Sequence, residues 1–260
     1  MTPESVSALF DLEGRTAIIT GASRGIGRAL ATGLAAAGAN VVVTARSASS
    51  LQAVSASVEA LGRRCDVHAL DVTDMASIEQ FFAALEHDGI KADILVNNAG
   101  IEQVCPSTDV DEPLWDRISN TNLKGAFFVA QHFARVLFEA RCQGSIINMG
   151  SLTSAVGVPG ATAYTSSKSG ILGMTRALST EWSPRGVRVN AMGPGYFRTA
   201  LTEQFYQDDR WQEAMLKKIP MQRFGDLNDL VGLCVFLAGN ASAYVSGQIF
   251  YVDGGYLAAI

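Results

Sequence analysis

Residues 16–37 read TAIITGASRGIGRALATGLAAA, and this stretch decides the fold. Its first five residues, Thr16–Thr20, are apolar or β-branched, which is typical of a buried strand. Gly21, Gly25 and Gly27 follow at once in a GxxxGxG spacing, and glycines permit a tight turn and let a pyrophosphate approach the backbone. The alanine-rich segment Gly25–Ala37 then predicts a helix whose first N–H groups and dipole favour an anion.

Six further short runs rich in β-branched residues alternate with predicted helices along the rest of the chain. They are Val41–Thr44, Val67–Leu70, Ile94–Val96, Ser145–Asn148, Val187–Asn190 and Ile249–Val252. Nearly all of their residues are apolar, as expected for parallel strands that helices cover on both faces. The helices between them include Leu51–Leu61 and Asp74–Leu85, and the second begins with a carboxylate suited to capping. The alternation predicts an α/β fold with a single Rossmann-type, doubly wound domain over residues 1–260 and a seven-stranded parallel sheet.

One segment departs from this rhythm. Residues 194–225 are polar and aromatic and follow the sixth predicted strand. Sheets of this kind bind ligands at the carboxyl ends of their strands. We therefore expect residues 194–225 to form a helical substrate lid.

Composition excludes several classes of protein. The chain has 260 residues, 48% of them hydrophobic, and its net charge of −5 includes no basic run that would follow nucleic acid or an anionic membrane. The four scattered cysteines and three histidines show no metal-ligand spacing, so no metal site is expected. The amino-terminal residues lack the apolar core of a signal peptide, and no segment is apolar enough to span a membrane. We expect a cytoplasmic protein that binds neither nucleic acid nor membrane.

Further motifs follow the later strands. Asn97-Asn98-Ala99-Gly100 comes after the fourth, Ser151 after the fifth, and Tyr164-x-x-x-Lys168 begins thirteen residues after that serine. Together TGASRGIG, NNAG, Asn122 in TNLKG, Ser151, YTSSK, PGYFRT and VDGG resemble the short-chain dehydrogenase/reductase family from end to end. The resemblance implies a nicotinamide-dependent oxidoreductase that moves a hydride between a dinucleotide and a carbonyl or secondary alcohol.

The resemblance also implies a catalytic group of Asn122, Ser151, Tyr164 and Lys168. Tyr164 is the acid/base, and Lys168 shares its helix face at i+4, where an ammonium favours the tyrosinate and lowers its pKa toward neutrality. Ser151 hydrogen-bonds the substrate oxygen and polarises it. Asn122 orders a water beside Lys168. Asn97 and its neighbours are expected to steady the central strands.

Cofactor contacts implied by the resemblance surround the glycine turn and the strand ends. They are Gly21, Ser23, Arg24, Gly25, Ile26, Gly27, Arg46, Asp71, Val72, Asn98, Ala99, Gly100, Tyr164, Lys168, Pro194, Gly195 and Thr199. Asp71 and Val72 border the adenine, and Thr199 lies near the nicotinamide carboxamide.

The second strand ends without the acidic residue that usually binds the ribose hydroxyls of NAD. Ala45 stands there, Arg46 follows it, and Arg24 lies in the glycine turn. Arginine's fork suits phosphate recognition, and basic residues at both places resemble the members of the family that prefer NADP(H). NADP(H) is therefore the expected cofactor, with NAD(H) as the alternative if both arginines lie in solvent.

The substrate is expected to be a sugar acid or another small polyol-like molecule, contacted by Glu102, Gln103, Ser151, Tyr196 and Phe197, with Arg198 nearby. The carboxyl-terminal segment is similar to the branch of the family that acts on acids such as gluconate. Reduction of a 3-oxoacyl group on a carrier protein is the near alternative. Arg185 is a candidate contact for an acidic carrier, but Cys142 stands where a second basic residue would be expected.

Two other classes of function remain. A dinucleotide-sensing binding protein would have no need of both Tyr164 and Lys168, and a purely structural protein would have no need of the glycine turn either. A catalytic role is therefore preferred. The family also implies a homotetramer that pairs the predicted helices Lys124–Ala140 and Thr165–Trp182. An apolar excess at Phe127, Phe128, Phe133, Val136 and Leu137 favours such an interface.

Overall fold

The strands form one seven-stranded parallel sheet in a computed structural model that describes residues 5–199 and 206–259. The strands are β1 (Thr16–Ile19), β2 (Asn40–Ala45), β3 (Cys65–Ala69), β4 (Ile94–Asn97), β5 (Gly144–Met149), β6 (Val187–Pro194) and β7 (Ile249–Val252). Their order is β3-β2-β1-β4-β5-β6-β7, and every neighbouring pair is parallel. All seven predicted strands and the α/β class are confirmed.

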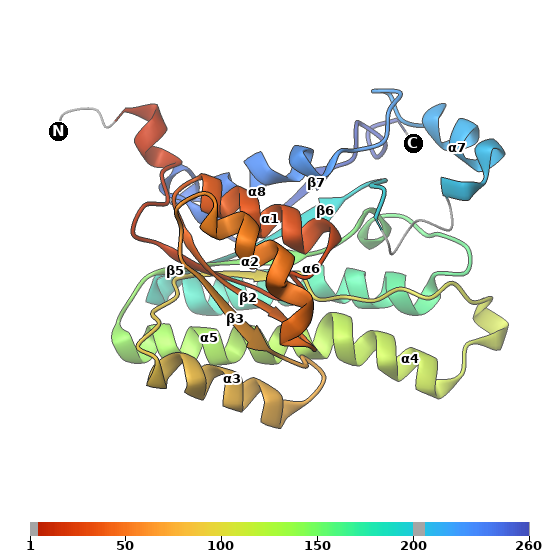
Figure 1. The fold of residues 1–260 in the computed structure, drawn as a ribbon. Coiled ribbons are helices and arrows are strands. Elements are labelled where there is room, and N and C mark those ends of the chain that lie inside the picture. The colour runs from red at the N-terminus through yellow and green to blue at the C-terminus, as the bar shows by residue number, and fades with distance from the viewer. Residues whose placement is uncertain (1–4, 200–205, 260) are drawn as a thin grey trace.

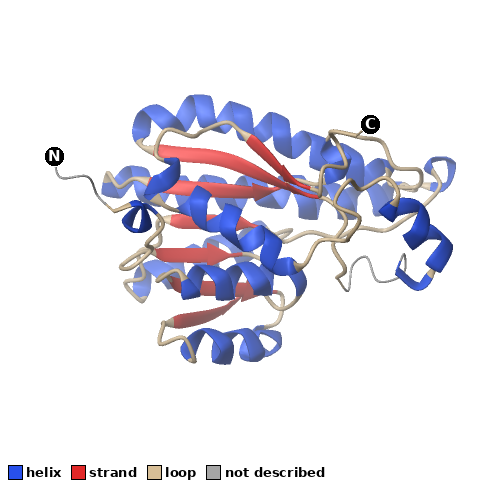
Figure 2. Cartoon of the chain, turned by 90° about the horizontal axis from the view of Figure 1, so that it is seen from above, coloured by secondary structure: helices blue, strands red, loops and turns tan. Residues whose placement is uncertain are grey.

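Helices cover both faces of the sheet, as Figures 1 and 2 show. They are α1 (Gly25–Ala36), α2 (Gln52–Glu59), α3 (Met75–His87), α4 (Glu112–Ser119), α5 (Ala126–Ala140), α6 (Thr162–Trp182), α7 (Asp209–Leu216) and α8 (Val231–Ala238). One apolar core joins α1, α2 and α8 to the sheet, and a second joins α3, α5 and α6 to its other face. Because both faces are covered, strand residues such as Val41, Val42 and Val43 are fully buried.

Local sequence explains where several elements begin and end. Asp74 caps α3 by accepting the N–H of Ala76, as its carboxylate predicts. The strand β6 continues four residues beyond the predicted Asn190, because Ala191–Pro194 pair with β7. Gly193 allows this pairing, since a Cβ there would lie 2.4 Å from the Tyr251 ring. Tertiary pairing thus extends a strand through residues with little β-propensity of their own.

The topology brings the predicted motifs to one edge of the sheet. The chain leaves β1 toward β2 and β3 and then returns to β4, so the order of strands reverses between β1 and β4. Ile19 pairs with Val96, and Asn97 pairs with Asn148. The segments that follow β1, β4 and β5 therefore emerge side by side at the switch point.

The predicted lid contains a helix, α7, which Asp208 caps by accepting the N–H groups of Arg210 and Trp211. Residues 200–205 of the predicted lid lie outside the described residues. Figure 1 shows α7 beside the carboxyl ends of the strands. No helix in the described part of the chain has the length and apolar character needed to cross a membrane.

The apolar excess expected on α5 is mostly absent from the surface. Phe133 and Leu137 are 2% and 3% exposed and belong to the core beneath the sheet, where Phe127 and Phe128 also pack. Val136 is 46% exposed, and Phe127 and Phe128 are only partly buried. The interpretation as an interface was wrong for Phe133 and Leu137, because the core on this face of the sheet already covers them.

Candidate active site

The glycine turn between β1 and α1 forms a cradle of the size and polarity that a phosphate needs. Gly21 and Gly25 have φ values of +66° and +55°, a region that favours glycine. A Cβ on Gly27 would lie 2.4 Å from Asn98 Nδ2, so no side chain fits there. The helix α1 begins at Gly25, and Arg24 provides no side-chain cap for its N–H groups. These N–H groups remain for an anionic ligand.

The segment after β4 is fastened to this turn. Asn98 Nδ2 donates to the carbonyls of Thr20 and Gly21 at 2.9 and 3.0 Å, and Thr20 Oγ1 accepts the Asn98 N–H at 3.0 Å. Asn97 Nδ2 donates to Asn148 Oδ1 at 3.0 Å and so ties β4 to β5. The expected role of Asn97 in steadying the central strands is confirmed.

Most other predicted cofactor residues follow the carboxyl ends of β1, β3, β4 and β6. They are Ser23, Ile26, Asp71, Val72, Ala99, Gly100, Pro194 and Gly195. Thr199 lies against the turn, because a Cβ on Gly25 would be 3.7 Å from Thr199 Cβ. The structure therefore places these residues at the carboxyl edge of the sheet, where sheets of this kind bind ligands.

The two arginines of the predicted phosphate site lie at this same edge. Arg46 comes directly after the end of β2, and the Ala22 N–H donates to the Thr44 carbonyl at 2.9 Å, which holds the glycine turn against that strand end. Arg24 and Arg46 are both exposed, and neither makes an ion pair within residues 5–199 and 206–259. Both guanidinium groups are therefore available to a phosphate.

Ser151, Tyr164 and Lys168 meet at the end of β5. Ser151 follows that strand, whereas Tyr164 and Lys168 lie one turn apart on α6. The Ser151 side chain lies close enough to the Tyr164 hydroxyl to lower its pKa, and Lys168 Nζ lies 5.6 Å from the centroid of the Tyr164 ring. Lys168 is only 5% exposed, and its Nζ donates to the Met149 carbonyl at 2.8 Å. The three residues form one compact cluster.

The electrostatics of this cluster differ from the expectation. Burial is the main cause that raises the pKa of Tyr164 above its usual value, the Glu102 carboxylate raises it further, and only the Ser151 hydrogen bond lowers it. Burial also lowers the pKa of Lys168 to about 8. Contrary to the lowering expected from Lys168, burial and the Glu102 carboxylate hold the pKa of Tyr164 above its usual value in the protein without cofactor. Tyr164 is a neutral phenol at pH 7.

Asn122 lies in a π-helical turn, Asn120–Gly125, between α4 and α5. Its Nδ2 donates to the Ile101 carbonyl at 2.9 Å and to Ser167 Oγ at 3.1 Å, and its Oδ1 accepts the Ile101 N–H at 2.8 Å. A Cβ on Gly100 would lie 3.3 Å from Asn122 Oδ1 and 3.5 Å from Lys168 Nζ. Asn122 is thus beside Lys168, as expected, but both of its amide hydrogens are already used.

Ser154 is a part of the site that sequence reasoning missed. Its hydroxyl accepts the Ser151 N–H at 3.1 Å and donates to the Lys168 carbonyl at 2.9 Å. It therefore fixes the strand end that carries Ser151 to the helix that carries Lys168. The available signal was the spacing of Ser151 and Ser154, which is that of a reciprocal capping box.

Of the remaining predicted substrate residues, one is exposed and two pack against other parts of the protein. Gln103 is exposed, and its side-chain oxygen accepts from Arg117. The Tyr196 ring packs edge-on against Trp211, 5.7 Å between centroids, and so belongs to the aromatic cluster beneath α7. Phe197 is 4% exposed and packs against Gly225, which makes it chiefly a packing residue.

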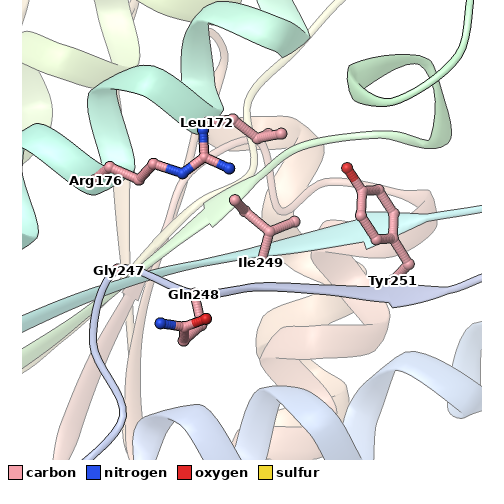
Figure 3. Close-up of a pocket in the computed structure, with 6 residues that line it drawn as sticks. All are labelled: Leu172, Arg176, Gly247, Gln248, Ile249 and Tyr251. Carbon is pink, nitrogen blue, oxygen red and sulfur yellow. The ribbon is translucent and has the colours of Figure 1, made fainter.

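Two hollows lie near the β7 edge of the sheet. The one in Figure 3 has a volume of about 460 Å³ and opens between α6 and β7; it is lined by Leu172, Arg176, Gly247, Gln248, Ile249 and Tyr251. The other, of about 360 Å³, includes Tyr196 and Phe197 in its lining. Neither is lined by Ser151, Tyr164 or Lys168, so the reacting group lies apart from both hollows.

A phosphate cradle at the switch point of a doubly wound sheet, next to a cluster of Ser151, Tyr164 and buried Lys168, defines a dinucleotide-dependent oxidoreductase of alcohols and carbonyls. Comparison with known proteins agrees with this class. A family model described as enoyl-(acyl carrier protein) reductase matches residues 21–257. The chain belongs to the short-chain dehydrogenase/reductase family.

Relatives resemble the chain over nearly its whole length. Gluconate 5-dehydrogenase of Gluconobacter oxydans (strain 621H) is 40% identical over 95% of this chain and 96% of its own. Among solved structures, a provisionally assigned short-chain alcohol dehydrogenase from Sinorhizobium meliloti 1021 is 54% identical with a TM-score of 0.93, covering 97% of this chain and 100% of its own. A gluconate 5-dehydrogenase from Burkholderia cenocepacia J2315, in complex with NADP and tartrate, is 34% identical with a TM-score of 0.95, covering 98% and 100%.

Proposed function

We propose that this protein interconverts a secondary alcohol and a ketone, with Tyr164 as the residue that transfers the proton. The observation that carries the proposal is the meeting of Ser151, after β5, with Tyr164 and Lys168 of α6, next to the glycine cradle. When bound, the nicotinamide exchanges a hydride with the substrate carbon and brings a positive charge in its oxidised form. All other parts of the chemistry belong to residues of this chain.

In the direction of reduction, the neutral Tyr164 phenol donates its proton to the substrate oxygen as negative charge develops there. Ser151 hydrogen-bonds the same oxygen and stabilises that charge. Lys168 has donors left after its bond to Met149, and these hold the nicotinamide ribose and stabilise the phenolate that remains. Asn122 positions Lys168 and the loop after β4, and it has one acceptor position left for the water predicted there.

NADP(H) fits the cofactor site best. Gly21, Gly25 and Gly27 leave space for the pyrophosphate, and exposed Arg24 and Arg46 flank the edge of β2 where a 2′-phosphate would lie. The related gluconate 5-dehydrogenase from Burkholderia cenocepacia, whose solved structure contains NADP, supports this choice. The other predicted contacts, which include Asp71, Val72, Asn98 and Thr199, retain the roles that the family resemblance gives them.

A small polyhydroxylated molecule, either a sugar acid or another polyol-like compound, is the proposed substrate class. Relatives that act on gluconate support it, and Ser151, Glu102, Gln103, Tyr196 and Phe197 are its proposed contacts. Reduction of a 3-oxoacyl group on a carrier protein is the second candidate, because a 3-oxoacyl-[acyl-carrier-protein] reductase of Thermotoga maritima is 37% identical over 94% of this chain. Arg185, the one basic residue kept for such a carrier, lies with its guanidinium carbon 3.5 Å from the Phe138 ring centroid, which weakens the carrier alternative.

The organisation of the whole chain is proposed on similar grounds. Residues 1–260 form one domain, with 194–225 as a lid whose described part includes α7. A cytoplasmic location agrees with four free cysteines.

A homotetramer remains the proposed assembly. Exposed Val136 and the outermost strand β7 support it, and light scattering at micromolar concentration would measure the mass.

The function is tested by turnover. The purified protein is mixed with NADP⁺ or NADPH and a panel of polyols, sugar acids, simple ketones and a 3-oxoacyl thioester, and nicotinamide absorbance is followed. Turnover of a polyol or sugar acid supports the proposal, and turnover of the thioester alone supports the carrier-protein alternative. Thermal stabilisation by NADPH without turnover of any compound would instead indicate a dinucleotide-sensing protein.

A further inference from the structure

The loop after β4 places one carboxylate, that of Glu102, against the proton-transfer pair. The residue before it, Ile101, is fixed by two hydrogen bonds from the buried Asn122 side chain. The residue before that, Gly100, lies so close to Lys168 that a Cβ there would be 3.5 Å from Nζ. Glu102 is therefore held beside the reacting group by a short, doubly anchored segment.

The charges of the cluster show that this carboxylate faces the site. The Glu102 carboxylate raises the pKa of both Tyr164 and Lys168. In return, the Lys168 ammonium lowers the pKa of the Glu102 carboxyl, although burial raises it by more. The carboxylate of Glu102, which follows the anchored Gly100–Ile101 segment, therefore lies near both Tyr164 and Lys168.

Among the described residues, only the Lys168 ammonium acts on the charge of Glu102. Within the described residues its side chain makes no ion pair and no hydrogen bond, and Lys168 is the only charged group that affects its pKa. The nearby Arg117 is committed to the side chain of Gln103. A partly buried carboxylate without a partner accepts hydrogen bonds from any hydroxyl placed against it and repels another anion.

We propose that Glu102 is a specificity-determining residue, which makes this protein act on an uncharged polyhydroxy substrate in preference to a sugar acid of the same chain length. Glu102 accepts a hydrogen bond from a substrate hydroxyl near the reacting carbon. It also repels a substrate carboxylate. This inference rests on the proposed function, which leaves both substrate types open, and selects between them.

The test compares matched substrates that differ at one carbon, which carries a hydroxymethyl group in one member and a carboxylate in the other. Sorbitol and gluconate share one hydroxyl pattern and differ at C1, as do xylitol and xylonate, and mannitol and mannonate. With NADP⁺, kcat/KM is measured for both members of each pair in the wild type, in Glu102→Gln and in Asp109→Asn. Glu102→Gln keeps the shape and removes the charge, whereas Asp109→Asn removes the same charge from an exposed position of the same loop.

The wild type is expected to favour the uncharged member by about tenfold or more, because a like-charge contact about 4 Å apart costs about fivefold in bulk water and about a thousandfold at an effective dielectric constant near 20. Glu102→Gln should reduce that ratio by about tenfold, and Asp109→Asn should leave it unchanged. A wild type that favours the sugar acids, or a ratio that Glu102→Gln does not change, would overturn the inference.

A wild type that turns over no member of any pair contradicts the proposed function instead. The role of Glu102 is then decided by equilibrium binding of the same pairs to the NADPH-bound protein, measured by calorimetry. Glu102→Gln must raise affinity for the anion relative to its neutral partner by a similar factor. Equal affinities in the two proteins would refute the role of Glu102 independently of turnover.

Discussion

The side chain of Asn122 holds the backbone of Ile101 from both sides, with Oδ1 accepting the Ile101 N–H at 2.8 Å and Nδ2 donating to its carbonyl at 2.9 Å. The same amide donates to Ser167 on α6. One buried asparagine therefore joins the loop after β4 to the helix that carries Tyr164 and Lys168.

Asn122→Ala should lower both stability and rate. Removing the amide leaves the Ile101 N–H and carbonyl without partners, which costs about 1–3 kcal/mol for each group that stays buried. The free energy of unfolding and kcat are measured together. Exposed Asn240 provides the control, since Asn240→Ala removes an amide that holds no loop. If Asn122→Ala matched the wild type in both quantities, Asn122 would not hold this loop.

Gly27→Ala should abolish nucleotide binding or prevent folding. The added Cβ would lie 2.4 Å from Asn98 Nδ2 and 2.4 Å from the Gly21 carbonyl, so the cradle must open to admit it. Gly232→Ala on α8 is the control, because nothing lies within 4 Å of its added Cβ and alanine favours a helix by about 1 kcal/mol. Fluorescence titration with NADPH measures the affinity. Unchanged affinity in a folded Gly27→Ala variant would exclude the turn as the phosphate site.

The cofactor preference should reverse in Ala45→Asp/Arg46→Leu. The parent is expected to favour NADP(H) by about tenfold to a hundredfold, since charge-assisted hydrogen bonds contribute about 1.5–3 kcal/mol. The double change removes one cation and adds a carboxylate that accepts from the free ribose hydroxyls of NAD(H). The ratio of kcat/KM for the two cofactors is measured on one substrate at fixed ionic strength. A parent that already favours NAD(H) would contradict the assignment of both arginines.

Lys168 should destabilise the fold most at neutral pH. Burial lowers its pKa from 10.5 to about 8, so between these values the unfolded chain binds more protons at this residue than the folded protein does. Its contribution to the free energy of unfolding therefore rises as the pH rises through this window, and below about pH 8 the full cost is present.

Chemical denaturation of the wild type and Lys168→Met at pH values from about 7 to about 10 isolates this contribution. As the pH rises over this interval, the free energy of unfolding of the wild type should increase by up to about 3 kcal/mol relative to that of the variant. A difference that stays constant with pH would mean that the Lys168 ammonium is not desolvated.

The sequence was most informative where local pattern decides structure. Apolar, β-branched runs predicted all seven strands, and the glycines after Thr20 predicted the turn, because both properties depend on neighbouring residues. The meeting of Ser151, Tyr164 and Lys168 in one group was expected from the family resemblance, whereas the hydrogen bonds from Asn98 to the glycine turn appear only in the structure.

Contacts between segments that are distant in the chain could not be predicted from the sequence pattern. The π-helical turn at Asn120–Gly125 has no local signature, since it depends on Asn122 reaching Ile101 and Ser167. The raised pKa of Tyr164 depends on burial and on Glu102, which is sixty-two positions away, while the i+4 rule considered Lys168 alone. Likewise, Phe133 and Leu137 were interpreted as an interface because a helical pattern does not show which partner covers it.

The most direct test of the account is the turnover number of Tyr164→Phe, measured with the dissociation constant for NADPH in the same preparation. Loss of the transferable proton should lower kcat by about 10²- to 10⁴-fold while the dissociation constant stays within error of the wild type. Tyr244→Phe, at a fully exposed tyrosine, should keep both values. A Tyr164→Phe variant that retains more than half of the wild-type kcat would contradict the assignment of Tyr164 as the acid/base.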